Sequence, residues 1–525
     1  MMNVFVPLVA TATLAWSAAL IAQAPVKSAS VPPARFTDPD RVAKLTSSFG
    51  DIDRVFKEYA EREHIPGAVW GIIIDGRLAH VGVTGYRDVA SKAPVDSATV
   101  FRIASMTKSF TAMAILKLRD EGKLALDDPA EKYVPELASL KYPTTDSPKI
   151  TVRHLLTHST GFPEDNPWGD QQLATSDEQL STMLRSGIPF SNAPGLAYEY
   201  SNYGFMILGR IVQNVSKMPY ADYVTANILR PLGMTSTTLE PSKVPADRLA
   251  HGYRWEDERW KEEKQLAHGA GGAMGGMLTS VNDLSRYVSV YLSAWPPHDG
   301  PETAPIKRSS LREMQQLWRP AGASVARDQS GAIQLTSGGY AYGLRVSQSC
   351  AFRTIVSHTG GLPGFGSIMQ WLPDYGVGIV AFGNLTYTGW TRTVTNAFEE
   401  LDKAGALTLR MPRPSPALLE MRDAASQLVV KWDDALAERI AAENLFLDQS
   451  KDRRRKAIDD LRAQVGACTM PKSFDIVENA LRGSWTMPCE RGPLQMSITL
   501  APTMPPRVQF LSVRPGTPAA PRACP

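Results

Sequence analysis

Apolar runs separated by turn-forming residues predict strands at the start and at the end of a long N-terminal region. Residues 69–74 are apolar, and Asp75-Gly76 separates them from a second apolar-rich run at residues 78–83. An Asp-Gly pair between two such runs is typical of a β-hairpin. Strand patterns return at residues 355–357, 366–372 and 377–382, and a turn-forming segment joins the last two.

Helical periodicity fills the space between these strands. Apolar residues 52, 55, 56 and 59 share one face of a predicted helix, residues 100–290 are mostly typical of helix and loop, and residues 393–403 predict a further helix. Since strands open and close the region, we expect an α+β fold, in which one antiparallel sheet has flanking helices and an all-helical insertion.

A second, smaller unit is predicted after the prolines at positions 412, 414 and 416, which mark a linker. Two helical and two strand patterns follow, so we expect a small C-terminal α+β domain of ordinary size. The expected division of the chain is a signal peptide (1–24), a flexible lead-in (25–45), the main domain (46–405), the linker (406–417), the small domain (418–513) and a disordered tail (514–525).

The N-terminus predicts export. Residues 4–21 contain no charged side chain, and Ala22-Gln23-Ala24 is typical of a signal-peptide cleavage site, although no Lys or Arg precedes the apolar run. That run is short and interrupted by Pro7, so a permanent membrane span is the weaker interpretation, and no later apolar run is long enough to form one. We therefore expect a periplasmic or secreted protein.

The four cysteines, at positions 350, 468, 489 and 524, fit an oxidising compartment because their number is even. The sequence leaves three pairings open. We favour Cys468 with Cys489, because both lie in the same short C-terminal region. Four unpaired buried thiols are the alternative for a cytosolic protein.

The overall composition excludes several classes of protein. With 43% hydrophobic and 21% charged residues, the chain is typical of globular rather than disordered proteins. Its 56 basic and 53 acidic side chains give a net charge of +3, so no charge imbalance indicates nucleic acid as a partner. We expect a small-molecule or peptide substrate, while the sequence does not give the oligomeric state.

A candidate nucleophile and its base lie at the start of a predicted apolar helix, in the segment Ser105-Met106-Thr107-Lys108. Positions three apart on a helix share one face, with Cβ atoms about 5–6 Å apart, so Lys108 is held beside Ser105. Burial favours the neutral amine, which accepts a proton from a hydroxyl nucleophile. The helix N-terminus would add N–H groups for a developing oxyanion. Alone, however, a Ser-x-x-Lys spacing is common by chance.

Two later segments carry groups of matching chemistry. A phenol between cationic groups, such as Tyr200, relays protons, and the amide of Asn202 suits a substrate amide. The segment 358–361, His-Thr-Gly-Gly, leads into an apolar strand, where small residues let an extended substrate approach and a backbone N–H completes an oxyanion hole. Taken singly, a packed aromatic, a turn Asn and a glycine loop explain these segments better.

Together the three elements resemble the motifs of penicillin-recognising serine hydrolases, which include class C β-lactamases, DD-peptidases and β-lactamase-like esterases. Their order along the chain is that of the family. The resemblance covers about residues 45–405, because further matching stretches lie at residues 101–108, 150–161, 194–195, 200–209, 231–234 and 271–283.

The resemblance implies an exported serine hydrolase that cleaves an ester or amide through a covalent acyl-enzyme, as an esterase or a D-amino-acid or DD-peptidase does. Ser105 would be the nucleophile, Lys108 the main base and Tyr200 the proton relay to the leaving group. Backbone N–H groups of Ser105 and Gly361 would form the oxyanion hole, and no metal or cofactor is implied. The implied substrate-binding residues are Asn202, which would also orient Lys108, His358, Thr359, Gly360 and Gly361.

One departure from the family's pattern bears on the substrate. His358 stands where β-lactamases usually have Lys, and a His is near half-charged around pH 6.5 whereas Lys stays cationic. A true β-lactamase and a catalytically inert penicillin-binding-like sensor are therefore the alternative functions. His154 and His158 are four residues apart, but a third ligand at credible spacing is missing, so no metal ion is expected there.

Overall fold

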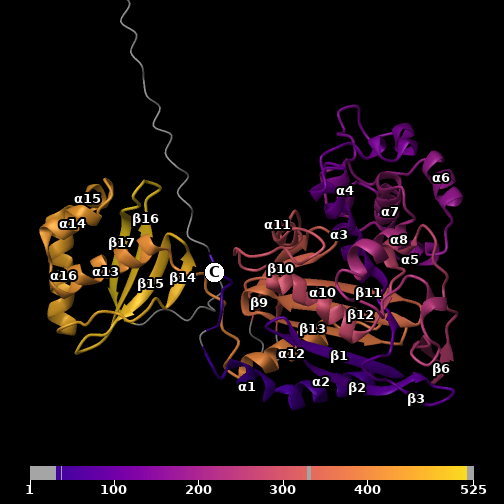
Figure 1. Ribbon diagram of the computed structural model, residues 1–525, viewed down its shortest axis with the longest axis horizontal. Helices are drawn as coiled ribbons and strands as arrows, with labels where there is room; N and C mark the ends of the chain where they lie inside the picture. The colour runs from indigo at the N-terminus through magenta and orange to yellow at the C-terminus, as the bar shows by residue number, and fades with distance from the viewer. Residues whose placement is uncertain (1–30, 37, 328–332, 517–525) are drawn as a thin grey trace, which may run out of the picture.

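The computed structural model describes residues 31–36, 38–327 and 333–516, which form a large mixed unit followed by a smaller one (Figure 1). The predicted signal peptide lies outside the described residues. Within the described ranges, no helix is both long and apolar enough to cross a membrane.

An antiparallel sheet forms the framework of the large unit, as the sequence predicted, and it has nine strands. The strands that open and close this region lie side by side at its centre, where Trp70 faces Ala381 across the pair. The central strands are buried over their whole length because helices cover both faces. In spatial order the strands are β3 (Ala93–Pro94), β2 (Arg77–Asp88), β1 (Gly67–Ile74), β13 (Val377–Gly383), β12 (Phe365–Leu372), β11 (Ile355–Leu362), β10 (Arg345–Ser349), β9 (Ile333–Tyr340) and β8 (Arg319–Arg327).

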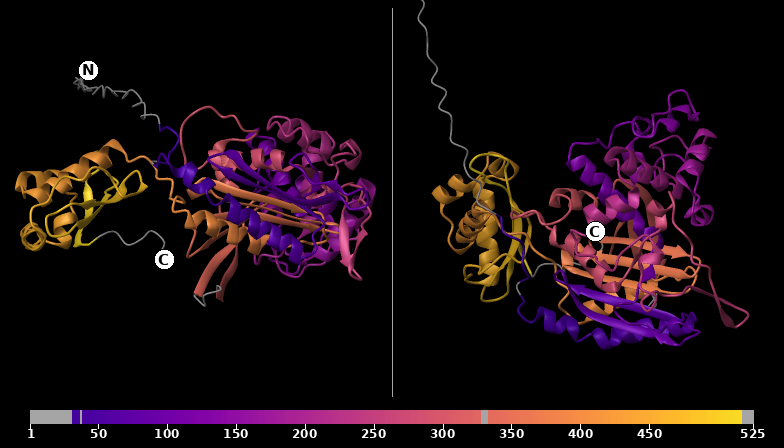
Figure 2. Two further views of the ribbon diagram at one scale, coloured as in Figure 1. Left: turned by 90° about the horizontal axis from the view of Figure 1, so that it is seen from below. Right: turned by 45° about the vertical axis from the view of Figure 1, so that its right-hand side comes forward.

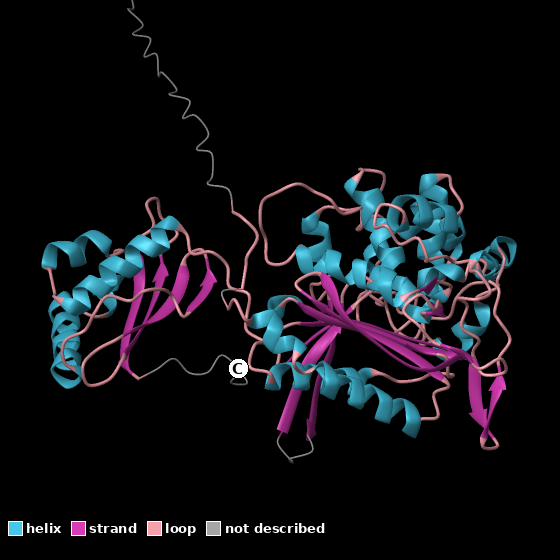
Figure 3. Ribbon diagram, turned by 60° about the horizontal axis from the view of Figure 1, so that its bottom comes forward, coloured by secondary structure: helices cyan, strands magenta, loops and turns pink. Residues whose placement is uncertain are grey.

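The helices that cover the sheet are α2 (Phe49–Arg62), α3 (Thr107–Asp120), α10 (Val281–Ser293) and α12 (Thr391–Lys403). Helices α2 and α12 share one apolar core with the sheet, in which Phe56 stacks on Trp70 at 4.9 Å between ring centroids. Helices α3 and α10 belong to the core on the other face, where Phe110 and Tyr287 stack at 3.8 Å. Figure 3 shows the sheet between these two layers.

The insertion between β4 (Phe101–Arg102) and β8 is not wholly helical, which corrects the prediction. It contains β7 (Leu278–Thr279), which pairs with β4, and a hairpin of β5 (Tyr253–Glu256) and β6 (Arg259–Glu262). The hairpin carries mostly charged side chains, so its sequence contains no apolar run that would predict a strand. Trp255 and Trp260 pack against each other across its two strands. The helices of the insertion are α4 (Val152–Leu156), α5 (Asn166–Gly169), α6 (Asp177–Arg185), α7 (Asn202–Ser216), α8 (Tyr220–Val224), α9 (Gly272–Gly275) and α11 (Arg308–Glu313).

The smaller unit has a four-stranded antiparallel sheet and an apolar core of its own, which includes the fully buried Trp485. Its helices lie against one face of that sheet, at the yellow end of the chain in Figure 1. The elements are α13 (Pro416–Val430), α14 (Asp434–Ile440), α15 (Leu445–Asp448), α16 (Lys451–Val465), β14 (Ile476–Asn479), β15 (Arg482–Met487), β16 (Leu494–Leu500) and β17 (Val508–Pro515).

Two ends of this unit differ from the prediction. Helix α13 begins at Pro416, inside the predicted linker, because Ser415 caps it by accepting a hydrogen bond from Leu418 N at 3.0 Å and proline suits the first helical turn. Strand β17 continues to Pro515, inside the predicted disordered tail, through its pairing with β16.

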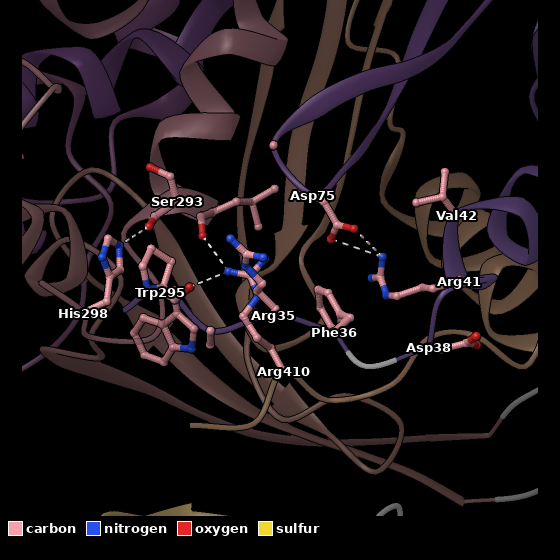
Figure 4. Close-up of a pocket in the computed structure, with 14 residues that line it drawn as sticks. Arg35, Phe36, Asp38, Arg41, Val42, Asp75, Ser293, Trp295, His298 and Arg410 are labelled. Carbon is pink, nitrogen blue, oxygen red and sulfur yellow. Dashed lines mark hydrogen bonds and ion pairs between the residues drawn. The ribbon is translucent and has the colours of Figure 1, made fainter. Parts of the chain in front are cut away.

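The described part of the predicted flexible lead-in is anchored to the large unit, which also corrects the prediction. Residues from position 41 form α1 (Arg41–Thr46). The buried Arg41 guanidinium donates to both carboxylate oxygens of Asp75 (Figure 4). It also donates to the carbonyl of Tyr375. The Arg41 guanidinium carbon lies 3.6 Å from the ring centroid of Phe36, and the same ring also faces Arg410. An ion pair and an aromatic contact therefore fix this segment beside the β1–β2 turn.

The favoured disulfide pairing is confirmed. Cys468 and Cys489 are bonded, and they join the segment after α16 to the segment that follows β15. Cys350 is disulfide-bonded as well, and no cysteine of the described residues is free.

Candidate active site

Ser105 lies in a short 3-10 turn, η1 (Ala104–Met106), that runs directly into α3. Ala104 before it has φ +46°, a left-handed conformation that L-residues rarely adopt and that often marks functional sites. The turn is held from both sides, because Ile103 N donates to Met277 O at 3.0 Å and Thr107 Oγ1 donates to Ala104 O at 2.7 Å. The serine hydroxyl is thereby presented at a fixed point, with 8% of the residue exposed.

Lys108 follows one helical turn later and is fully buried. Its Nζ lies 3.1 Å from Ser105 Oγ, 2.6 Å from Asn202 Oδ1 and 2.9 Å from Met274 O. Burial lowers the pKa of this amine to about 7, although the carboxylates of Asp165 and Asp170 oppose the shift. The neutral form can donate its two N–H groups to the two carbonyl oxygens and accept the Ser105 proton, as a general base must.

Asn202 is placed by the N-terminus of α7. Its backbone N–H and that of Tyr203 donate to the carboxylate of Asp165, at 2.6 and 2.8 Å, and Ser201 caps the same helix. An anionic side chain is stabilised at this end of a helix. The Asn202 side chain is buried, and its Nδ2 donates to Asn166 Oδ1 at 3.3 Å. The Asn202 side chain therefore contacts both Lys108 Nζ and Asn166, and Asn166 lines the pocket.

Tyr200 lies beside both proposed proton-transfer partners. The Lys108 ammonium is 4.9 Å from its ring centroid. Burial raises the pKa of the phenol above its usual value, and a hydrogen bond with Ser105 opposes the shift. The ring packs against His158, with centroids 4.3 Å apart. Tyr200 is therefore a protonated donor close to the nucleophile, which suits proton delivery to a leaving group.

Strand β11 forms the opposite wall. Strand β10 pairs with β11 only at residues 355–357, so within the described sheet residues 358–362 have no strand partner on that side. The alternation of a strand turns Thr359 and Gly361 toward the pocket and Gly360 inward. A Cβ on Gly360 would lie 2.1 Å from Ile103 O, so this glycine permits close approach to the Ser105 turn. Thr359 and Gly361 thus face the pocket, where a substrate-binding residue must lie, whereas Gly360 packs against the Ser105 turn.

His358 differs from the expectation of a half-charged side chain. It is buried, its Nε2 lies 2.8 Å from the Tyr340 hydroxyl, and its Nδ1 lies 2.6 Å from Thr359 O. Burial and the nearby Lys108 lower its pKa to about 3. The ring is therefore neutral at physiological pH, with Nδ1–H donating to the carbonyl, and it supplies no cation.

A different residue supplies the cation of this pocket. Arg345, at the start of β10, lines the pocket together with Ser105 and Thr359, and its Nη2 donates to the Tyr198 hydroxyl at 3.1 Å. Among the described residues it has no carboxylate partner within ion-pair distance. No pattern in the sequence marked β10, so this residue was missed.

The pocket has a volume of about 400 Å³ and is lined by several further residues that no motif contained. Those are Glu164, Asn166, Tyr198, Glu199, Arg345 and Tyr387. They come from loops and from strand ends far apart in the sequence, so only the fold brings them together.

The two candidate metal-ligand histidines serve local contacts. His154 closes the capping box of α4 with Thr151, and His158 Nδ1 accepts a hydrogen bond from Ser201 N at 3.0 Å. Within the described ranges, no group of three or more His, Cys, Asp or Glu side chains is arranged to hold a metal ion.

A serine and a buried lysine on successive helical turns, facing the open edge of an antiparallel sheet, are the hallmark of the penicillin-recognising serine proteins. The chain belongs to the beta-lactamase family, whose model matches residues 52–402. Protein flp of Staphylococcus aureus (strain COL) is 30% identical over 336 residues, which cover 64% of this chain and 62% of that protein. Penicillin-binding protein 4* of Bacillus subtilis (strain 168) is 26% identical over 332 residues, which cover 61% and 68%.

The fold has a counterpart among solved structures. The octameric penicillin-binding protein homologue from Pyrococcus abyssi superposes with a TM-score of 0.58 at 22% identity, covering 87% of this chain and 91% of that one. The chain spans about 62% of the length of the flp proteins it resembles.

Proposed function

We propose that this protein is a serine hydrolase that forms a covalent acyl-enzyme on Ser105 and cleaves an ester or amide. The observation that carries the proposal is the buried Lys108 amine, 3.1 Å from Ser105 Oγ and with its pKa lowered to about 7. Lys108 takes the hydroxyl proton as Oγ bonds to the substrate carbonyl carbon. Tyr200 passes a proton to the leaving group as the bond between the carbonyl carbon and the leaving group breaks. Water then hydrolyses the acyl-enzyme and releases the acyl group as an acid.

We further propose a substrate with a carboxylate in its leaving group, as in D-amino-acid and DD-peptidases. Arg345 supports this choice, because it is an exposed guanidinium in the pocket without an ion-pair partner among the described residues. Its neighbour Tyr198 precedes Tyr200 by two residues, so a carboxylate at Arg345 would lie on the leaving-group side. A simple carboxylesterase would not require this cation.

β-Lactamase activity ranks below these activities. The neutral, buried His358 replaces the lysine that β-lactamases usually have at this position. An inert binding protein also ranks below, since the nucleophile, its base and the tyrosine are all present and close together.

We also propose that the protein works outside the cytosol, in the periplasm or secreted. The Cys468–Cys489 disulfide and the disulfide-bonded Cys350 support this location, because such bonds persist in oxidising compartments.

The experiment is an intact-mass measurement after incubation with a fluorophosphonate, a p-nitrophenyl ester and a penicillin. The Ser105→Ala variant serves as the control, and its thermal melt shows whether it is folded. We expect the parent to gain the mass of the fluorophosphonyl group and the variant to gain nothing. Labelling of both proteins, or of neither while both are folded, would contradict the proposed nucleophile.

A further inference from the structure

Tyr387 lies at the end of the pocket away from Arg345. It follows β13, and its ring packs on Gly361, since a Cβ built on that glycine would lie 2.8 Å from Tyr387 Cδ1. Its backbone N–H donates to Phe365 O at 3.2 Å, at the turn between β11 and β12. Tyr387 has φ +54°, an unfavourable conformation for a bulky residue and one that often marks a functional constraint.

The two ends of the pocket are separated along β11. Arg345 is paired with Ser357, whereas Tyr387 lies against Gly361, four residues further along the strand. Four residues of a strand span about 13 Å. Tyr200, the proton donor to the leaving group, shares the Arg345 end through Tyr198 and Tyr340. The acyl half of a substrate bound at Ser105 must therefore point toward Tyr387.

The Tyr387 side chain joins the two walls of the site. Its hydroxyl donates to Asp170 Oδ2 at 2.9 Å, and Asp170 lies in η4 (Asp170–Gln172) of the helical insertion. Next to it, a Cβ on Gly169 would be 2.5 Å from Asn202, so this segment packs directly on the Lys108 support. A hydrogen bond thus links the sheet wall to the helical wall beside the acyl end.

Asp170 depends on this contact. The residue is 5% exposed, and within the described structure the Tyr387 hydroxyl is the one hydrogen-bond partner of its carboxylate. Burial raises the pKa of the carboxyl to about 6, and the bond to Tyr387 opposes that shift. A buried polar group with a single partner makes that partner costly to remove. Although Tyr387 is 51% exposed, its side chain is therefore held in place across the end of the pocket.

We propose that Tyr387, held by Asp170, closes the acyl end of the site and restricts the enzyme to substrates with short acyl groups. This inference rests on the proposed function, and within it favours the short aminoacyl group of a D-amino-acid peptidase substrate over the longer peptidyl group of a DD-peptidase substrate. Tyr387 is a specificity-determining residue here, and Asp170 is a positioning residue that acts through it.

The test is a series of p-nitrophenyl esters that share one leaving group and differ in acyl length, from acetyl to hexanoyl. The ratio of kcat/KM for acetyl over hexanoyl is measured for the parent, Tyr387→Ala and Tyr387→Phe. Tyr86→Ala, at a half-exposed tyrosine of β2 outside the pocket, is the matched control. We expect the parent to favour acetyl, the alanine variant to lower the ratio about tenfold or more, and the control to leave it unchanged.

Tyr387→Phe separates the two residues, because it keeps the ring and removes the bond to Asp170. We expect its ratio to fall between those of the parent and Tyr387→Ala, whereas a ratio equal to the parent's would overturn the part assigned to Asp170. Equal ratios in the parent and Tyr387→Ala, or no preference for acetyl in the parent, would overturn the whole inference. Should the alanine variant not fold, Tyr387→Leu takes its place, and a ratio equal to the parent's in that variant overturns the inference.

Fluorophosphonate labelling distinguishes failure of this inference from failure of the proposed function. If the folded parent is not labelled at Ser105, the proposed function fails. If every variant is labelled at Ser105 and the acetyl-to-hexanoyl ratio is the same in all of them, the serine hydrolase proposal is retained and only the acyl-end closure fails.

Discussion

Lys108 Nζ lies 2.6 Å from Asn202 Oδ1, inside a fully buried environment. This contact and the one to Met274 O occupy two N–H groups of the amine, which turns the remaining position of the nitrogen toward Ser105. The Asn202 amide and the Met274 carbonyl thus orient the lone pair of the Lys108 amine toward the Ser105 hydroxyl.

The acid limb of the pH profile should report Lys108. Because burial lowers the pKa of its amine to about 7, kcat/KM should rise as the pH increases through about 7 and then level off. The measurement is kcat/KM for a neutral ester between about pH 5 and pH 9. A profile that is flat across this window would contradict the assigned base.

The lowered pKa of Lys108 also makes the free energy of unfolding depend on pH. An unfolded lysine has a pKa near 10.4, so between about pH 7 and pH 10 the unfolded chain binds more protons at this residue than the folded one. The contribution of Lys108 to the free energy of unfolding therefore increases with pH across that window.

Asp165→Asn should move the acid limb of activity to lower pH. The Asp165 carboxylate raises the pKa of Lys108 against the effect of burial, so its removal leaves the amine easier to deprotonate. Loss of the charged acceptor at the start of α7 should also cost about 1–2 kcal/mol of stability. The pH profile and a denaturant titration measure the two effects. Asp222→Asn, at an exposed position of α8, should change neither.

Arg345→Gln should lower kcat/KM for substrates that carry a carboxylate and leave kcat/KM for neutral substrates unchanged. A hydrogen bond to a charged group contributes about 1.5–3 kcal/mol, so kcat/KM for a D-alanyl-D-alanine-type peptide should fall at least tenfold. A p-nitrophenyl ester without a carboxylate should be hydrolysed as before. Arg259→Gln on the exposed β5–β6 hairpin is the matched control, and an equal loss on both substrates would speak against carboxylate recognition.

Gly360→Ala should impair both stability and turnover. The added methyl would lie 2.1 Å from Ile103 O, which is backbone and must move, and the Ser105 turn would move with it. We expect a loss of about 1–3 kcal/mol in the free energy of unfolding and a lower kcat. Gly389→Ala has no atom within 4 Å of the new methyl and should stay within about 0.5 kcal/mol of the parent. Calorimetry and steady-state kinetics on both variants decide the point.

The sequence predicted those parts of the fold whose side chains repeat with a clear period. Strands at residues 69–74, 366–372 and 377–382 were found because they are buried on both faces and read as continuous apolar runs. Strands β8, β9 and β10 were missed, since their residues are mostly small, polar or exposed and their pairing involves distant segments. β8 and β9 extend beyond the rest of the sheet, where little apolar burial is needed (Figure 2).

The site divides in the same way. Ser105 and Lys108 were proposed from their spacing together with the other two motifs, and that spacing brings them to one face of a helix, 3.1 Å apart. Arg345, Asp165 and Tyr387 reach the site from a missed strand and from loops, so no local pattern contained them. The charge of His358 was misjudged because burial, which the sequence does not give, outweighs its ordinary pKa.

The unpartnered part of β11 also bears on contacts with other protein molecules. A strand edge with free N–H and C=O groups is a template on which other chains can stack and aggregate. Here His358, Thr359 and Gly361 of this edge line the pocket beside Ser105. The pocket walls, which come from loops and from the helical insertion, therefore stand between this edge and any strand of another molecule.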